Sequence, residues 1–253
     1  MKRLENNVTI ITGGGKGIGF GLATAFAKEG SNLVLTGRTE SRLVSAAGKL
    51  QDEYGVEVLT FVADGADEDA VRRVVSGTIE KFGKIDTLVN NAQVSKSGLP
   101  LVGHTKEDFA LAINSGLYAA FFYMRECFPA LKASKGSVIN FASGAGLFGK
   151  LGQSSYAAAK EGIRGLSRVA AAEWGPDGVR VNVVCPLAMT ESLMEWKEKY
   201  PDLYKNTIQG IPLGRFADPV DDIGRVCVFL ASEDAHYVTG ETITLQGGSG
   251  LRP

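Results

Sequence analysis

The 253-residue chain has only two histidines and three cysteines, and this scarcity removes several classes of chemistry. A serine hydrolase needs a histidine beside its nucleophile, and neither His104 nor His236 lies in a G-x-S-x-G or H-E-x-x-H context. The cysteines, Cys127, Cys185 and Cys227, are far apart and have apolar neighbours. Their spacing gives no disulfide framework and no C-x-x-C zinc site, so the sequence predicts no metal.

The chain also lacks an excess of charge of one sign and any long apolar run. Its 27 basic and 28 acidic residues leave a net charge of -1, without the basic footprint of a nucleic-acid-binding protein. No apolar stretch approaches the roughly 20 residues that cross a bilayer, and the polar start from Met1 to Asn7 has no room for a signal peptide. We therefore expect a cytoplasmic protein with reduced cysteines and with neither nucleic-acid nor membrane partners.

What the chain does contain is a regular alternation of short apolar runs and helical patterns. Several of the runs are apolar at nearly every position, as in strands of a parallel sheet that is covered on both faces. The candidate strands are Val8–Thr12, Asn32–Thr36, Glu57–Ala63, Thr87–Asn90, Ser137–Phe141, Arg180–Cys185 and Thr242–Leu245. The candidate helices are Ile18–Glu29, Glu40–Tyr54, Glu68–Phe82 and Ser155–Trp174, with one more starting at Asp218-Pro219.

This alternation predicts an α/β fold of the Rossmann-like, doubly wound kind, with about seven parallel strands and helices on both faces. No linker composition divides it, so residues 1–253 are expected to form a single domain. One stretch, Pro186 to Phe216, is irregular and rich in large apolar side chains such as Met189, Met194 and Trp196. We interpret residues 187–215 as a mobile lid over a binding crevice.

A glycine-rich string, Thr12-Gly-Gly-Gly-Lys-Gly-Ile-Gly19, follows the first predicted strand and precedes a helix. Glycines at this place permit a tight turn and the close approach of a pyrophosphate to the helix N-terminus. A phosphate-binding P-loop would need Ser or Thr after the lysine, and Gly17 stands there. The predicted dinucleotide contacts are Gly13, Gly15, Lys16, Gly17, Ile18 and Gly19.

The end of the second predicted strand indicates which dinucleotide is bound. NAD-dependent proteins place an acid there for the ribose 2′-hydroxyl, whereas this chain has Arg38. A guanidinium grips a phosphate in bidentate fashion, and Lys16 adds a second positive charge. Both could equally be solvated surface cations, and Glu40 is close to Arg38. NADP(H) is nevertheless the predicted cofactor.

Tyr156 and Lys160 lie four residues apart in a predicted helix and therefore share one face of it. A free tyrosine has a pKa of roughly 10, and a neighbouring ammonium is expected to lower the pKa so that the phenol can act as an acid or base. Ser143 follows the fifth predicted strand, where its hydroxyl can hold a substrate oxygen. Tyr-x-x-x-Lys alone arises by chance in many helices, so its weight comes from the other motifs.

The glycine string, Asn90-Asn-Ala92, Ser143, Tyr156 and Lys160 occur in an order that resembles the short-chain dehydrogenase/reductase family, in its compact single-domain branch. The resemblance covers essentially the whole chain. It implies an oxidoreductase that interconverts a ketone and a secondary alcohol by hydride transfer to or from a nicotinamide cofactor. It also implies a homotetramer.

The resemblance assigns roles to individual residues. Ser143 would orient the substrate oxygen, Tyr156 would exchange its proton, and Lys160 would bind the nicotinamide ribose and lower the tyrosine pKa. Asn114 would be the helix asparagine that holds a water for proton relay. The other implied cofactor contacts, besides Tyr156 and Lys160 themselves, are Asp64, Gly65, Asn91, Ala92, Leu187 and Thr190.

Two departures from the family pattern flank the predicted active site: Gln93 and Leu187 each stand where the family usually has glycine. The implied substrate contacts are Gln93, Ser143, Gln153, Leu187 and Met189. Three segments, Asn90–Gln93, Asn140–Gly149 and Cys185–Thr190, are similar to those of bacterial NADP-dependent 12α-hydroxysteroid dehydrogenases. This similarity implies a bulky apolar substrate, a bile acid, whose 12α-hydroxyl group is the reacting group.

Two other functions fit the same motifs. A 3-oxoacyl-carrier-protein reductase or a broad carbonyl reductase would use the same chemistry, and a non-catalytic NADP(H)-binding sensor would need only the glycine turn. The catalytic set of Ser143, Tyr156 and Lys160 argues for the enzyme. The run from Phe121 to Met124 gives its helix more apolar circumference than one core face needs, in keeping with the implied tetramer.

Overall fold

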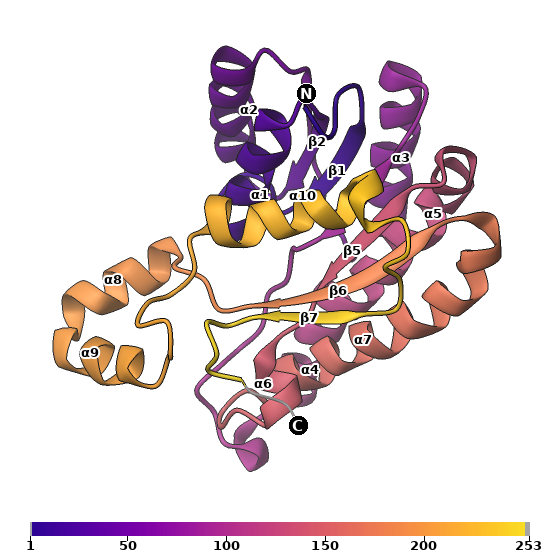
Figure 1. Ribbon diagram of the computed structural model, residues 1–253. Coiled ribbons are helices and arrows are strands. Elements are labelled where there is room, and N and C mark those ends of the chain that lie inside the picture. The colour runs from indigo at the N-terminus through magenta and orange to yellow at the C-terminus, as the bar shows by residue number, and fades with distance from the viewer. Residues whose placement is uncertain (1, 251–253) are drawn as a thin grey trace.

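The computed structural model describes residues 2–250, apart from the side chain of Ser192, and this part of the chain contains seven strands in one parallel sheet (Figure 1). All seven begin and end within one residue of the predicted positions. They are β1 (Val8–Thr12), β2 (Asn32–Gly37), β3 (Val58–Val62), β4 (Thr87–Asn90), β5 (Ser137–Phe141), β6 (Arg180–Pro186) and β7 (Thr242–Leu245). The predicted single-domain, doubly wound α/β fold is confirmed.

The strand order is β3-β2-β1-β4-β5-β6-β7, so the chain reverses its direction of travel across the sheet between β1 and β4. In such sheets, ligands bind outside the carboxyl ends of the strands at this switch point. The register brings those ends level: Thr12 lies beside Thr36, and Asn90 lies beside Asn140. The segments that follow β1, β2, β4 and β5 therefore start along one edge.

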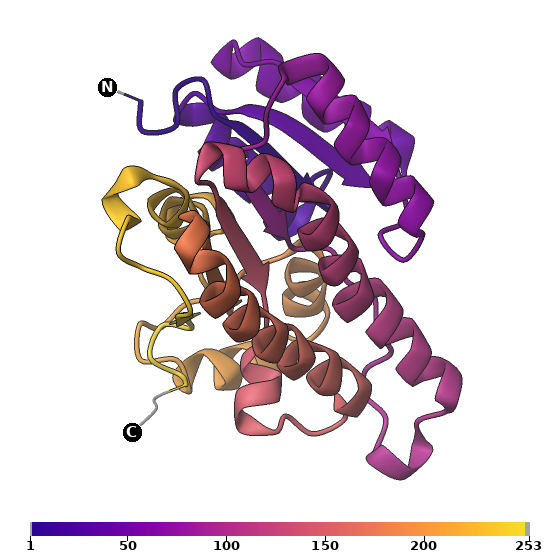
Figure 2. The same cartoon turned by 90° about the vertical axis from the view of Figure 1, so that its right-hand side faces the viewer.

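Helices cover both faces of the sheet, and each face has its own apolar core. One core joins α1 (Gly17–Lys28), α2 (Glu40–Tyr54) and α10 (Arg225–Ala231) to the strands. The other joins α3 (Glu68–Phe82), α5 (Ala119–Ser134) and α7 (Ser154–Trp174), the layer nearest the viewer in Figure 2. The shorter elements are η1 (Leu101–Gly103), α4 (Lys106–Ala112), α6 (Gly144–Phe148), η3 (Gly175–Asp177) and η5 (Glu233–Ala235).

Two π-helical turns interrupt the regular helices. The turn η2 (Ile113–Tyr118) joins α4 to α5, and η4 (Pro219–Gly224) precedes α10. The second begins where the sequence predicts a helix, because the Asp218 side chain accepts hydrogen bonds from the backbone N–H groups of Val220 and Asp221. Single π-turns inside helices are frequently found at functional sites.

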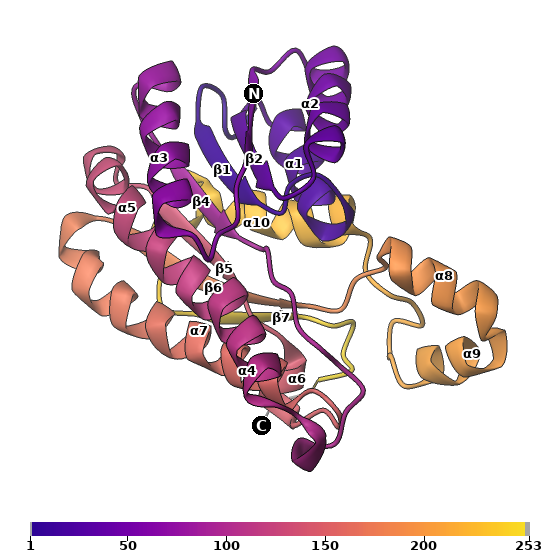
Figure 3. The same cartoon turned by 180° about the vertical axis from the view of Figure 1, so that it is seen from behind.

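The predicted lid is more regular than its sequence suggested. It contains two helices, α8 (Glu191–Lys199) and α9 (Pro201–Gln209), which stand away from the sheet in Figures 1 and 3. The Thr190 hydroxyl caps the first helix by accepting from Leu193 N, and Pro201 opens the second. These two start signals lie inside a run without a long apolar stripe, which is why periodicity alone did not reveal them.

The three cysteines are buried, as predicted. Every helix within residues 2–250 is too short or too polar to act as a membrane span.

Candidate active site

The glycine string forms a bare turn between β1 and α1. Gly13 and Gly17 have φ angles of 69° and 54°, which residues with a side chain rarely adopt. A Cβ at Gly19 would overlap the carbonyl oxygen of Gly13. No side chain caps the N-terminus of α1, so its first backbone N–H groups can bind an anion.

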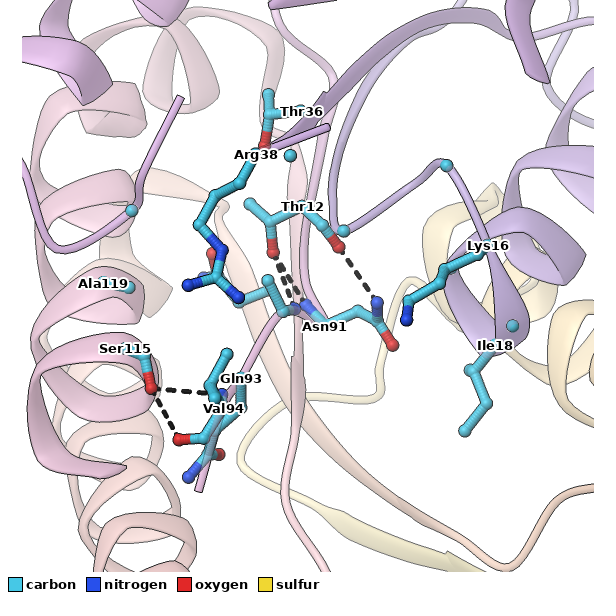
Figure 4. Close-up of a pocket in the computed structure, with 18 of the residues that line it drawn as sticks. Thr12, Lys16, Ile18, Thr36, Arg38, Asn91, Gln93, Val94, Ser115 and Ala119 are labelled. Atoms are coloured by element: carbon cyan, nitrogen blue, oxygen red, sulfur yellow. Dashed lines mark hydrogen bonds between the residues drawn. The ribbon is translucent and has the colours of Figure 1, made fainter. Parts of the chain in front are cut away.

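Thr12 fixes the loop after β4 against this turn. Its hydroxyl accepts hydrogen bonds from the backbone N–H groups of Asn91 and Ala92, both at 3.0 Å, and its carbonyl oxygen accepts one from Asn91 Nδ2 (Figure 4). We did not predict a role for Thr12. Its position as the last strand residue before the glycines is the sequence signal that could have suggested one.

A cavity of about 480 Å³ opens above this edge of the sheet. Its walls come from the ends of β1 to β4 and from α1, α2, η2, α5, α7 and the start of α8. The predicted cofactor and substrate contacts that line it are Gly13, Gly15, Lys16, Gly17, Ile18, Gly19, Arg38, Asp64, Gly65, Asn91, Ala92, Gln93 and Thr190. The bare turn and the cavity beside it suit a dinucleotide.

Three cations line the cavity: Lys16, Arg38 and Arg42. Figure 4 shows Lys16 and Arg38 approaching the cavity from different elements. In the described part of the chain, none of the three forms an ion pair with an acidic side chain. Glu40 is not among the lining residues. Arg42, which lies in the first turn of α2, four residues after Arg38, was not predicted from the sequence.

The predicted catalytic side chains meet where β5 ends. Tyr156 forms a hydrogen bond with the Ser143 hydroxyl, and Lys160 Nζ lies 5.6 Å from the centre of the Tyr156 ring. The Lys160 side chain is buried, and Nζ donates a hydrogen bond of 2.6 Å to the carbonyl oxygen of Phe141. Ile163, one turn further along the same face of α7, lines the cavity and links this group to it.

The lowered pKa expected for Tyr156 is not what the structure gives. Burial raises the pKa of the phenol, and the hydrogen bond with Ser143 lowers it by a smaller amount. Burial also lowers the pKa of Lys160 to about 7. The lysine directs its hydrogen bond to Phe141 O rather than to the phenol, so desolvation governs both groups.

Comparison with known proteins agrees with this arrangement. The family model described as enoyl-(acyl carrier protein) reductase matches residues 13–249. A 12α-hydroxysteroid dehydrogenase from a Clostridium species is 59% identical over 259 residues, which cover 100% of both chains. The chain belongs to the short-chain dehydrogenase/reductase family. It is an oxidoreductase of that family.

Two further relatives span the chain. A 3-oxoacyl-(acyl-carrier-protein) reductase from Thermotoga maritima is 36% identical, with 97% of this chain and 98% of the relative covered. The crystal structure of L-sorbose reductase from Gluconobacter frateurii, complexed with NADPH and L-sorbose, has a TM-score of 0.93 at 30% identity, with 100% of each chain covered. The family uses nicotinamide cofactors.

Asn114 lies in the π-helical turn η2 and is exposed to solvent. It is not among the residues that line the cavity, whereas the next two residues, Ser115 and Gly116, are. The water-holding role of Asn114 stays a prediction.

Six predicted substrate or cofactor residues lie outside the cavity walls: Ser143, Gln153, Tyr156, Lys160, Leu187 and Met189. Leu187 N donates to Leu245 O and Met189 N donates to Ala217 O, so the base of the lid is fixed to β7 and to the segment after α9. Trp196, Tyr204 and Phe216 form an aromatic cluster with ring centres about 6 Å apart.

Proposed function

We propose that this oxidoreductase is an NADP(H)-dependent hydroxysteroid dehydrogenase, which interconverts a 12α-hydroxyl group and the corresponding ketone on a bile acid. The full-length 59% identity to a 12α-hydroxysteroid dehydrogenase carries the substrate assignment. The catalytic set at the end of β5 is in keeping with turnover, since a cofactor-binding sensor would need only the glycine turn and the cations.

The three cavity-lining cations support NADP(H) as the cofactor. The ribose 2′-phosphate of NADP(H) carries negative charge, and Arg38 and Arg42 offer two guanidinium groups where an NAD-binding protein would place an acid. Lys16 lines the same cavity from the glycine turn. The bare N–H groups of α1 would hold the pyrophosphate, while Asp64 and Gly65 would flank the adenine and Thr190 the nicotinamide amide.

The chain's own residues handle the proton. A nicotinamide bound in the cavity supplies or accepts the hydride. In ketone reduction, the Tyr156 hydroxyl gives its proton to the carbonyl oxygen as the alcohol forms, while Ser143 Oγ holds that oxygen. Because burial keeps the pKa of Tyr156 above its ordinary value, the phenol is protonated at neutral pH and is suited to act as the acid. Oxidation of the alcohol requires the phenolate and should accelerate as the pH rises.

The lid supplies an apolar surface suited to a steroid nucleus. Met194 and Leu203 are exposed on α8 and α9, and Trp196 belongs to the adjacent aromatic cluster. We propose that Leu187, Met189 and Gln153 contact the substrate when the lid closes over it. A short polar substrate would gain little from these side chains.

Absorbance of NADPH at 340 nm tests the assignment directly. The purified protein is mixed with NADPH and, in separate reactions, with a 12-ketosteroid, an acetoacetyl thioester and a small aromatic ketone. The proposal predicts the highest kcat/KM for the 12-ketosteroid. A higher value for the thioester would instead favour the 3-oxoacyl reductase function, and no consumption with any ketone would favour the sensor.

A further inference from the structure

The backbone on both sides of Gln93 is fixed by hydrogen bonds. Before it, Thr12 holds the N–H groups of Asn91 and Ala92. After it, Val94 N donates to Ser115 Oγ at 3.1 Å, and Ser115 Oγ donates to Val94 O at 2.8 Å (Figure 4). The chain between β4 and η2 therefore holds Gln93 in one place on the cavity wall.

The side chain of Gln93 packs against the bare backbone of Gly116. A Cβ at Gly116 would lie 2.7 Å from Gln93 Cδ, 2.8 Å from Oε1 and 2.9 Å from Nε2. A Cβ at these distances would displace the flexible end of the Gln93 side chain, so glycine at 116 leaves free the space that the carboxamide occupies. The position of the amide of Gln93, a departure from the family pattern, thus depends on glycine at 116.

The protein provides hydrogen-bond partners for only part of the Gln93 carboxamide. Gln93 Nε2 donates to Ala112 O at 3.5 Å, the outer limit of a hydrogen bond. Gln93 Oε1 is shielded from solvent and has no hydrogen-bond partner among the described residues. Leaving a buried acceptor unmatched costs free energy, so a donor that reaches it would bind favourably. The last torsion of a glutamine side chain is soft, so Oε1 can be redirected without movement of the backbone.

The sheet register places this amide near the reacting groups. Asn90 pairs with Asn140 on β5, and Gln93 and Ser143 each follow three residues later on adjacent strand ends. Lys16 belongs to the segment after β1, and Arg38 and Arg42 belong to the segment after β2, which lies on the far side of β1 from β4. Gln93 therefore lies on the β4 and β5 side of the cavity, the side of Ser143.

We propose that Gln93 and Gly116 form a functional pair, in which the Gln93 carboxamide accepts a hydrogen bond from an O–H group of a molecule bound at the reacting end of the cavity. The donor is a hydroxyl of the nicotinamide ribose or of the substrate. This inference rests on the oxidoreductase site proposed above, but it does not require the substrate to be a steroid.

Three variants test the pair. Gln93→Met keeps the length of the side chain and removes the amide, and Gly116→Ala displaces the amide. The exchange Gln93→Gly with Gly116→Asn supplies an amide from the helix side instead. Each is compared with wild type for the NADPH Kd, from protein fluorescence, and for kcat and KM with whichever ketone the wild type reduces fastest. Gly48→Ala is the matched control, because a Cβ at this α2 residue meets nothing within 4 Å.

We expect Gln93→Met and Gly116→Ala each to lose roughly three- to ten-fold in one of the affinities, the value of one neutral hydrogen bond. A raised NADPH Kd identifies the ribose as the donor, and a raised ketone KM at unchanged Kd identifies the substrate. The exchange variant should recover most of the loss, which a general packing defect would not allow. If Gln93→Met keeps Kd, kcat and KM within two-fold of wild type, the proposal is overturned, even if Gly116→Ala fails to fold.

Discussion

At the scale of single residues, the burial of Lys160 dominates the electrostatics of the site. Its side chain is only 3% exposed, and the hydrogen bond that holds Nζ goes to a neutral carbonyl oxygen, that of Phe141. A buried ammonium without a carboxylate partner is unfavourable, and burial lowers the pKa of Lys160 to about 7. The protein accepts this cost in stability at the position where the proposed chemistry needs a lysine.

The dependence of stability on pH should expose this cost. Between about pH 7 and pH 10, the unfolded chain binds a proton at Lys160 that the folded chain does not, so the free energy of unfolding should rise with pH. From pH 7.5 to 9.5 the contribution is roughly 2 kcal/mol. Urea unfolding of wild type and of Lys160→Met at both pH values isolates the contribution of Lys160, because the two proteins share the other titrating groups. Equal pH dependence in the two proteins would show that Lys160 keeps its ordinary pKa when folded.

The cations that line the cavity should set cofactor preference. Replacing Arg38 with Asp removes a bidentate phosphate ligand and introduces repulsion, so kcat/KM for NADPH should fall roughly ten- to a hundred-fold while that for NADH is retained or improved. Arg42→Ala should lower kcat/KM for NADPH by a smaller factor than the replacement of Arg38 with Asp. The control is Arg225→Asp, the same charge change at an exposed residue outside the cavity. Equal use of NADH and NADPH by wild type would contradict the assignment.

At the scale of elements, the regular strands of the sheet could be predicted from the sequence, whereas the lid helices and the π-turn could not. The strands were predictable because runs such as Val8–Thr12 are buried along their whole length. The helices of the lid were not, since few of their side chains pack on the body. The π-turn η2, which contains Asn114, was not predicted, because nothing in the residue pattern announces the change of helical period. The contact of Gln93 with Gly116 likewise depends on a close approach that only the folded structure shows.

The lid helices should respond to substrate. Helix α9 contains no buried residue, so its backbone amides are expected to exchange quickly in the protein without substrate. Saturation with NADPH and a steroid ligand should slow hydrogen exchange across α8 and α9, because an apolar ligand gives their exposed side chains a surface to cover. The amides of β5, which are buried in the sheet, serve as the internal reference. Unchanged exchange in α8 and α9 would rule out closure of the lid over the substrate.

At the scale of the whole molecule, one helical surface is too apolar for a chain exposed to water. Tyr118 is 49% exposed and Phe121 is 37% exposed, and Arg125 lies over the Phe121 and Phe122 rings. These side chains come from η2 and α5, whereas Tyr123 and Met124 of the same helix are buried. Apolar patches of this kind mark protein–protein interfaces, so the surface supports the tetramer that we propose.

Light scattering at micromolar concentration should give four times the mass of one chain. Phe121→Glu should shift this mass towards the dimer or monomer, because a charge would be buried at the proposed interface. Val44→Glu, at an exposed site on α2, introduces the same charge away from that surface and should leave the mass unchanged. A wild-type mass of one chain would refute the tetramer.

The central claim is that cofactor binding and proton transfer are performed by separate groups. The glycine turn and its neighbouring cations hold the dinucleotide, while Tyr156 alone exchanges the proton with the substrate oxygen. The decisive measurement is therefore turnover and NADPH affinity of Tyr156→Phe, made side by side on the same preparation. We predict a loss of kcat of roughly a hundred- to ten-thousand-fold with the NADPH Kd within about two-fold of wild type. Near-normal kcat in this variant would contradict the assignment of Tyr156 as the acid and base, and with it the proposed mechanism.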